Sequence, residues 1–240
     1  SRFVFPFPRI IYLIFLIFFS RLPAREAEGI PIRRIHPRPG LPPGSKAIPL
    51  RFPLRYDDKK FFPIRKEAVM LELLKHRRSI RTFTDEPVSQ ENIDSLLKAA
   101  LLAPSSMGKK PVECIVVRNK ETIARLKTYK KHGTTPLGTA PLAIVVIADG
   151  QKSDVWVEDA SIVSILIQLE AEKLGLGSTW IQLRRREGDS GPSEEAFRQE
   201  LGIPEHYGVL SVVAIGHKNE QKKPYTDADL DFTKVHYETF

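Results

Sequence analysis

Three arginines surround a serine at the point where an apolar helical pattern ends. The stretch "HRRSIRTF" holds Arg77, Arg78 and Arg81 around Ser79. A helix C-terminus alone favours basic side chains by about 0.3–1 kcal/mol, through its unpaired carbonyl groups and its dipole. So much positive charge in one turn also suits an anion, because arginine forms charge-assisted hydrogen bonds with phosphate and carboxylate groups. The four residues are therefore a candidate anion-binding site.

A second stretch, "APSSMGKKP" at residues 103–111, follows a predicted helix. Its hydroxyl groups can donate hydrogen bonds, and Gly108 allows the backbone to approach a flat ligand closely. Taken alone, the stretch indicates a loop. No Gly-rich phosphate loop follows a strand in this sequence, so a phosphate would be held by side chains and single backbone amides.

Other familiar catalytic patterns are missing from the sequence. It has no Ser-His-Asp set, no Cys-His pair and no histidines at metal-ligand spacing. Cys114 is the only cysteine, so no internal disulfide can form, and its place in the apolar stretch "VECIVVR" is typical of an inert buried thiol. We assign no catalytic side chain and no metal ligand, and we expect a cytoplasmic protein.

The net charge of +8 is concentrated in the first part of the chain. Residues 1–69 hold 14 Lys and Arg against 5 Asp and Glu, a balance of +9, which leaves 23 against 24, or −1, for residues 70–240. A near-neutral domain lacks the basic face with which proteins bind nucleic acid. We therefore expect no nucleic-acid partner.

Residues 1–69 form a basic, Pro-rich extension that holds 11 of the 19 prolines. Its apolar segment "IIYLIFLIFF" is short for a membrane span and fits the core of a signal peptide, although a poor cleavage site follows it. Met70 opens an ordinary amphipathic helix. We expect residues 1–69 to be largely disordered or not native to the catalytic unit, as a leader, an anchor or translated upstream sequence, and we do not expect membrane contact.

Residues 70–240 alternate helical and strand patterns, which indicates a compact α+β domain. Apolar periodicity and helix-end residues predict helices over "EAVMLELLKHR", "SQENIDSLLKAALLA", "KETIARLKTYKK", "DVWVEDASIVSILIQLEAEKL" and "SEEAFRQEL". Apolar runs predict strands over "PVECIVVRN", "PLAIVVIAD", "GSTWIQL" and "GVLSVVAIG". The last 24 residues have no apolar period of their own, so they must pack on something else, such as another subunit.

In this order and spacing, several stretches resemble the nitroreductase family of FMN-dependent oxidoreductases. They are "RRSIRTF", "LLAPSSMGKKP", "WVEDASIVSILIQLEAEKLGLGSTWIQ" and "VVAIGHKNEQKKPY", and the resemblance covers residues 70–240. It implies a central mixed β-sheet flanked by helices and an intertwined homodimer. It also implies FMN sites at the subunit interface and NAD(P)H as the electron donor.

The resemblance also implies which residues hold the cofactor. The segment from Arg77 to Arg81 resembles the family's first FMN segment, with an arginine on the phosphate and a cation near the N1 edge of the ring. The other implied positions are a loop that comes from the second subunit, a backbone stretch that faces N5 and O4, and late basic residues on the phosphate: Pro104, Ser105, Ser106 and Gly108; Gln182 and Leu183; Lys222 and Lys223.

Two departures from the family pattern lie in the loop. Many members have Asn where Gly108 stands, and Gln-Pro-Trp where this chain has Lys110, Pro111 and Val112. These changes bear on the ring contacts and on the substrate pocket.

The function that the resemblance implies is hydride transfer from NAD(P)H to flavin N5, followed by reduction of a nitroaromatic, a quinone or a flavin. The cofactor carries the difficult chemistry, and the protein stabilises the negative charge of the reduced ring, for example with Arg81. Two alternatives remain at this point. One is a flavin-binding carrier or sensor without significant turnover, and the other is a membrane-associated interaction protein that uses residues 1–22.

Overall fold

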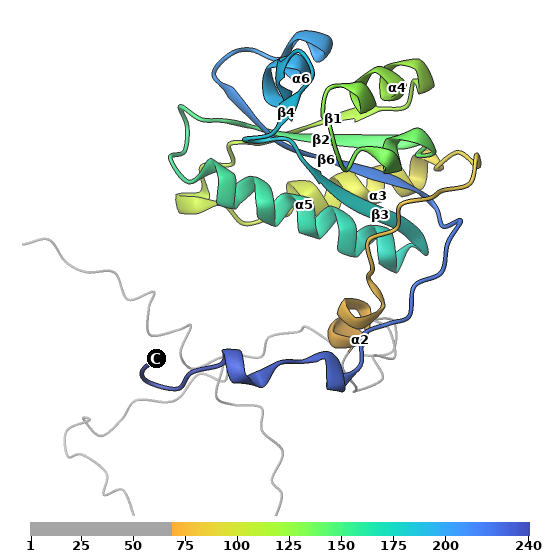
Figure 1. Cartoon of the computed structure of the whole chain (residues 1–240). Helices are drawn as coiled ribbons and strands as arrows, with labels where there is room; N and C mark the ends of the chain where they lie inside the picture. Colours follow the sequence, from red (N-terminus) through yellow and green to blue (C-terminus); the bar gives the residue numbers. More distant parts are fainter. Residues whose placement is uncertain (1–68) are drawn as a thin grey trace, which may run out of the picture. The chain divides into compact units, whose positions relative to one another are not determined.

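The computed structural model describes residues 69–240, which Figure 1 shows as ribbon. The expectations for residues 1–68, including the apolar segment and the Pro-rich stretch, lie outside the described residues. Within 69–240, no helix combines the length and the apolar character needed to cross a membrane.

Four antiparallel strands form the central sheet in the order β1-β2-β6-β3. Their bounds are Val112–Val117 for β1, Leu142–Asp149 for β2, Leu176–Gln182 for β3 and Tyr207–His217 for β6. All eight residues of β2 are buried, as expected for a central strand that is covered on both faces. The parallel part of the expected mixed sheet consists, in the described chain, of an isolated bridge between Ser79 and Ser178 at the outer edge of β3.

Two helical layers cover the sheet (Figure 1). Helices α3 and α5 lie on one face, and α4 and α6 lie on the other. Successive residues of β2 serve the two faces in turn, because side chains alternate along a strand: Val145 joins the cluster of α4 and α6, and Val146 joins that of α3 and α5. The bounds of these helices are Gln90–Leu101 for α3, Lys120–Thr128 for α4, Trp156–Lys173 for α5 and Ser193–Leu201 for α6. A further helix, α2 (Val69–His76), precedes the sheet in the chain.

Helix boundaries follow the capping signals in the sequence. Ser89 caps α3, because its Oγ accepts a hydrogen bond from the backbone N–H of Asn92 at 3.2 Å. Helix α5 ends where Gly175 adopts a φ of +76°, a left-handed conformation that glycine takes without strain. The predicted helices and strands of residues 70–240 are confirmed.

The chain beyond β6 runs in an extended path with two short 3-10 turns, Asp227–Asp229 and Phe232–Lys234. Its large apolar side chains are exposed, with exposed fractions of 71% for Phe232 and 83% for Tyr237. The prediction that this tail has no core of its own is confirmed for the described chain.

Cys114 lies on β1 and is partly buried against the α3–α5 side of the core. Burial raises the pKa of its thiol to about 11. A thiol with so high a pKa is neutral at physiological pH, which agrees with the prediction of an inert packing residue.

Candidate functional site

The arginine-rich segment after α2 runs along the outer edge of β3. The backbone N–H of Ile80 donates to the Ser178 carbonyl at 3.0 Å, and the hydroxyl of Thr179 donates to the Ile80 carbonyl. A Cβ on Gly177 would stand 2.8 Å from Ile80 Cγ2, so only glycine permits this close approach. The strand edge therefore fixes the path of the residues around Ser79.

The tail lies against the other side of the same segment. The backbone N–H of Asn219 donates to the Thr82 carbonyl at 3.0 Å, and that of Tyr225 donates to the Lys75 carbonyl at 2.9 Å. Between these two bonds, the carboxylate of Glu220 accepts from the backbone N–H of Arg81. Three of the four stretches singled out in the sequence thus meet at one edge of the sheet.

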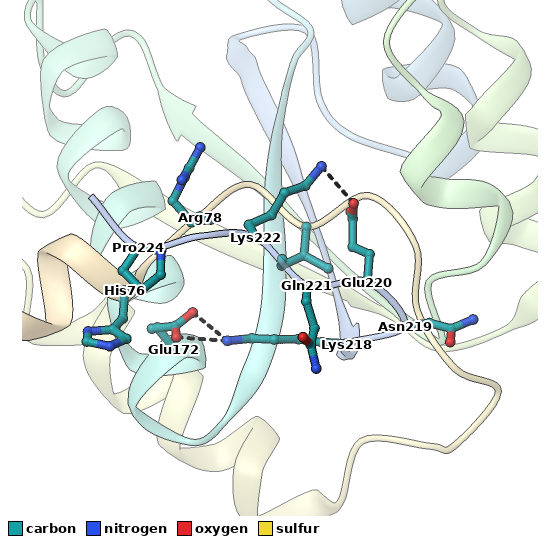
Figure 2. A pocket seen from close by; sticks show the side chains of 10 residues that line it. His76, Arg78, Glu172, Lys218, Asn219, Glu220, Gln221, Lys222 and Pro224 are labelled. Carbon is teal, nitrogen blue, oxygen red and sulfur yellow. Dashed lines mark hydrogen bonds and ion pairs between the residues drawn. The ribbon is translucent and has the colours of Figure 1, made fainter. Parts of the chain in front are cut away.

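A cavity of about 590 Å³ opens between the segment and the tail. Figure 2 shows its two ion pairs, Lys218 with Glu172 at 2.8 Å and Lys222 with Glu220 at 2.8 Å. The ion pair with Lys222 and the N–H of Arg81 hold the pKa of Glu220 below its ordinary value. With Arg78, the lining carries three cations and two carboxylates, a balance of +1, which suits an anionic group.

Arg77 and Arg78 have different surroundings. The Arg78 guanidinium donates to the Lys223 carbonyl and lies over the Tyr225 ring, 4.2 Å from its centroid, so it fastens the tail to the end of α2. Arg77 is half-buried, and its side chain has no hydrogen-bond or ion-pair partner among residues 69–240. The guanidinium of Arg77 is therefore available to a bound anion.

The two late lysines differ in the same way. Lys222 lines the cavity but is paired with Glu220, whereas the ammonium group of Lys223 has no acidic partner within the described part of the chain. The Arg81 side chain is exposed and makes a long contact of 3.5 Å with the Ser79 carbonyl. Arg77, Arg81 and Lys223 are thus the cations that a ligand could recruit without breaking an ion pair.

Leu183, the second residue of the predicted backbone stretch, differs from Gln182 in the direction of its backbone N–H. Its side chain is fully buried, and its backbone N–H donates to the Leu210 carbonyl at 2.9 Å, toward β6. Because backbone groups alternate between the two edges of a strand, the N–H of Gln182 points to the outer edge instead. Of the two predicted residues, only Gln182 presents a backbone donor on the side of the arginine-rich segment.

The loop at residues 103–111 is held by two local anchors. The Ser106 N–H donates to Asp159 Oδ1 at 2.8 Å, and the Ser105 hydroxyl accepts from the Lys110 N–H at 2.9 Å. Gly108 has a φ of +68°, and a side chain there would meet nothing within 4 Å. Glycine adopts this left-handed conformation without strain.

This loop lies far from the cavity within one chain. It is anchored at Asp159, and the cavity is bounded by Glu172, thirteen residues further along α5. A rise of 1.5 Å per residue separates the two positions by about 20 Å. Within a single chain, the predicted loop residues Pro104, Ser105, Ser106 and Gly108 therefore do not join the arginine-rich segment.

Sequence reasoning did not single out Asp159 or Glu220 as residues of the site. The sequence does carry a signal for Asp159, which lies four and eight residues before Val163 and Ile167 on the apolar stripe of α5. A carboxylate on a buried face needs hydrogen-bond donors, and here they are the Ser106 N–H in the loop and the Ser153 hydroxyl just before α5.

Known proteins are similar to this chain in both sequence and fold. The family model described as Nitroreductase family matches residues 74–136 and 128–217. A protein of Archaeoglobus fulgidus, named as a candidate NADH dehydrogenase/NAD(P)H nitroreductase, is 39% identical over 174 residues, which are 70% of this chain and 97% of the relative. The FMN reductase (NAD(P)H) of Bacillus subtilis is 30% identical over 179 residues, which are 65% of this chain and 69% of the relative.

The solved structure of an FMN-dependent nitroreductase from Clostridium difficile R20291 is 50% identical. The match covers 71% of this chain and 100% of that chain, with a TM-score of 0.70. The α+β fold expected from the sequence is confirmed by this likeness. Together with the arginine-rich segment beside β3, these matches establish that the chain belongs to the nitroreductase family.

Proposed function

We propose that the chain binds FMN along the outer edge of β3 and passes electrons from NAD(P)H to a small organic acceptor. As a member of its family, the chain is a flavoenzyme of the nitroreductase type. The observation that supports the assignment of the site is the half-buried Arg77, which has no partner in residues 69–240 and whose chain neighbours His76 and Arg78 line the cavity at the edge of the sheet.

The residues at this edge fit the two ends of FMN. Arg77 and Lys223 are available for the phosphate, and Arg81 lies further along the segment, where it would face the N1 edge of the ring. The backbone N–H of Gln182 would face N5, four residues along β3 from Ser178, a separation of about 13 Å. FMN, when bound, supplies the hydride chemistry, and the protein residues orient it and balance its charge.

The second wall of the site comes from another copy of the chain. The loop of Ser105 and Ser106 lies about 20 Å from the cavity in its own chain, so it reaches the flavin of a partner subunit in a homodimer. Apolar side chains that are more than a third exposed give this dimer a surface to bury: Met70, Leu71, Leu74, Leu101, Leu102, Met107, Ile162, Ile165, Tyr225, Leu230, Phe232, Val235, Tyr237 and Phe240.

We place the catalytic unit in residues 70–240 and the enzyme in the cytoplasm. The family match begins at residue 74, and the 71% of this chain that matches the Clostridium difficile structure covers all of that protein. A single cysteine with a raised pKa is compatible with a reducing compartment.

The acceptor is a nitroaromatic, a quinone or a free flavin. Each of these is a planar molecule that accepts electrons from a reduced flavin at an accessible face.

An absorbance spectrum of the purified protein tests this proposal. We expect a flavin spectrum that bleaches when NADH or NADPH is added without oxygen and that returns when a quinone is added. A colourless protein would refute the flavin site. A yellow protein that bleaches far more slowly than it binds the nucleotide would favour the carrier or sensor.

A further inference from the structure

A second basic cavity, of about 420 Å³, lies at the far end of α4. Lys130, Lys131 and His132 line one side, and Arg186 and Glu187 line the other. The two sides come from different parts of the chain, the turn after α4 and the turn after β3 with the start of the short strand β4 (Glu187–Gly188). None of these residues belongs to the flavin site proposed above.

The backbone holds the two sides together. The N–H of Lys131 donates to the Glu187 carbonyl at 3.1 Å. A Cβ on Gly188 would stand 2.6 Å from the Tyr129 carbonyl oxygen, so the turn after α4 packs on a position that only glycine can occupy. Arg186 is therefore brought beside the lysines by the fold and not by a chance side-chain conformation.

The lining of this cavity carries three basic side chains, Lys130, Lys131 and Arg186, and one carboxylate, Glu187. Within residues 69–240, no ion pair joins Lys130, Lys131 or Arg186 to a carboxylate, and Glu187 is not paired with any of them. Burial and the charge of Arg186 lower the pKa of Lys130. The dipole of α4 favours a cation at the helix end, but it does not account for Arg186, which comes from another part of the chain.

The cavity begins next to the end of β3. The N–H of Arg186 donates to the Leu183 carbonyl at 3.0 Å and so closes a turn, which keeps the Cα atoms of these residues within about 7 Å. Leu183 follows Gln182, whose N–H we place opposite flavin N5. A nicotinamide that transfers hydride must stack there with its reacting atoms about 3–3.5 Å apart, and the rest of the nucleotide must extend away from that point.

We propose that the cavity of Lys130, Lys131 and Arg186 binds a phosphate group of the NAD(P)H donor. The inference rests on the proposed function. The phosphate has two possible sources, the pyrophosphate that NADH and NADPH share and the ribose phosphate that only NADPH carries. Lysine and arginine at a solvent-open cavity suit either source, and the two cofactors distinguish them.

Steady-state kinetics of the full-length, FMN-loaded enzyme test the proposal. We expect Lys130→Gln and Arg186→Gln each to raise the KM for the donor about five- to tenfold, with an unchanged flavin spectrum. An equal rise for NADH and NADPH assigns the site to the pyrophosphate, and a rise for NADPH alone assigns it to the ribose phosphate. Lys127→Gln is the matched control, because Lys127 lies in the last turn of the same helix but lines a different cavity.

A titration with inorganic pyrophosphate, followed by calorimetry, separates this inference from the proposed function. We expect the wild type to bind pyrophosphate and the double variant Lys130→Gln/Arg186→Gln to bind it at least tenfold more weakly. If the enzyme oxidises no NAD(P)H but this difference remains, the phosphate site stands and its assignment to the donor fails with the proposed function. If the cavity variants match Lys127→Gln in both experiments, the site itself is refuted.

Discussion

The carboxylate of Asp159 accepts a hydrogen bond from the backbone N–H of Ser106 at 2.8 Å. Its second oxygen accepts from the hydroxyl of Ser153 at 3.3 Å, and only 3% of Asp159 is exposed. The buried carboxylate of Asp159 on α5 thus holds in place the loop that, in the proposed homodimer, would contact the flavin of the partner subunit. Asp159 does not touch the proposed cofactor, so its effect on the site passes through Ser106.

Asp159→Ala should destabilise the protein by about 1–3 kcal/mol and weaken FMN binding, because it leaves the Ser106 N–H and the Ser153 hydroxyl without their acceptor. Asp159→Asn should cost less, since its amide oxygen can still accept from Ser106. Urea unfolding and titration of apoprotein with FMN measure the two effects. If Asn were as damaging as Ala, the negative charge and not the hydrogen bond would be what the loop requires.

Arg77→Ala should weaken FMN binding about tenfold to more than a hundredfold and leave the unfolding free energy nearly unchanged. The reason is that a charge-assisted contact with phosphate contributes about 1.5–3 kcal/mol, whereas this side chain has no partner in the described protein. Arg78→Ala is the matched comparison, because it removes the bond to the Lys223 carbonyl and the contact with Tyr225. It should free the tail, which limited proteolysis would detect. If wild type and Arg77→Ala bound FMN with equal affinity, Arg77 would act only as a favourable charge at the end of α2.

Arg81→Met should make the two-electron midpoint potential of bound FMN more negative by about 15–30 mV. Loss of the cation costs the reduced, negatively charged ring more than the neutral oxidised ring, and about 30 mV corresponds to 1.4 kcal/mol. We expect a shift closer to about 15 mV than to about 30 mV, because the Arg81 side chain is exposed and salt in the solvent screens its charge. A dye-linked titration measures the shift. An unchanged potential combined with weak binding of oxidised FMN would move Arg81 to the phosphate.

Cys114 should react slowly with iodoacetamide while the protein is folded. Burial raises its pKa from 9.0 to about 11, so at pH 8 the folded protein holds roughly a hundredfold less thiolate than the unfolded chain. Folding favours the neutral thiol, so burial of the thiol adds to the free energy of unfolding. This contribution is fully present below pH 9 and is lost as the pH rises toward 11. The rate of the reaction with iodoacetamide at pH 8, measured with and without urea, tests this prediction. Cys114 is the only cysteine in the sequence, so no other thiol contributes to the rate. Similar rates in both states would mean an accessible thiol.

Most of the fold of residues 70–240 could be predicted because its signals are local. The apolar runs of β2 and β6, the cap at Ser89 and the glycine after α5 each fix an element without reference to distant residues. The lack of a separate core in the tail could also be predicted from a local signal, because a segment without periodic apolar residues cannot form a core of its own.

The details of the site depend on contacts between distant residues, which the sequence does not reveal. The distinction between Arg77 and Arg78 arises because the Lys223 carbonyl, 145 positions away, engages only the second arginine. Likewise, Leu183 could not be separated from Gln182 until the pairing with Leu210 fixed which backbone N–H faces outward. Register and long-range pairing set such assignments, and a shift of one residue reverses them.

The division of the flavin site between two subunits can be tested by mixing two defective variants. Arg77→Ala damages the arginine-rich segment, and Asp159→Ala damages the loop about 20 Å away in the same chain. In a heterodimer of the two, a shared site means that one site carries both defects and the other carries none. Co-expressed chains with different affinity tags should therefore yield heterodimers that bind one FMN with wild-type affinity, whereas each homodimer binds weakly at both sites. Heterodimers with two weak sites would place the loop and the arginine of each site in the same chain, and the proposed dimer would then have no part in holding the cofactor.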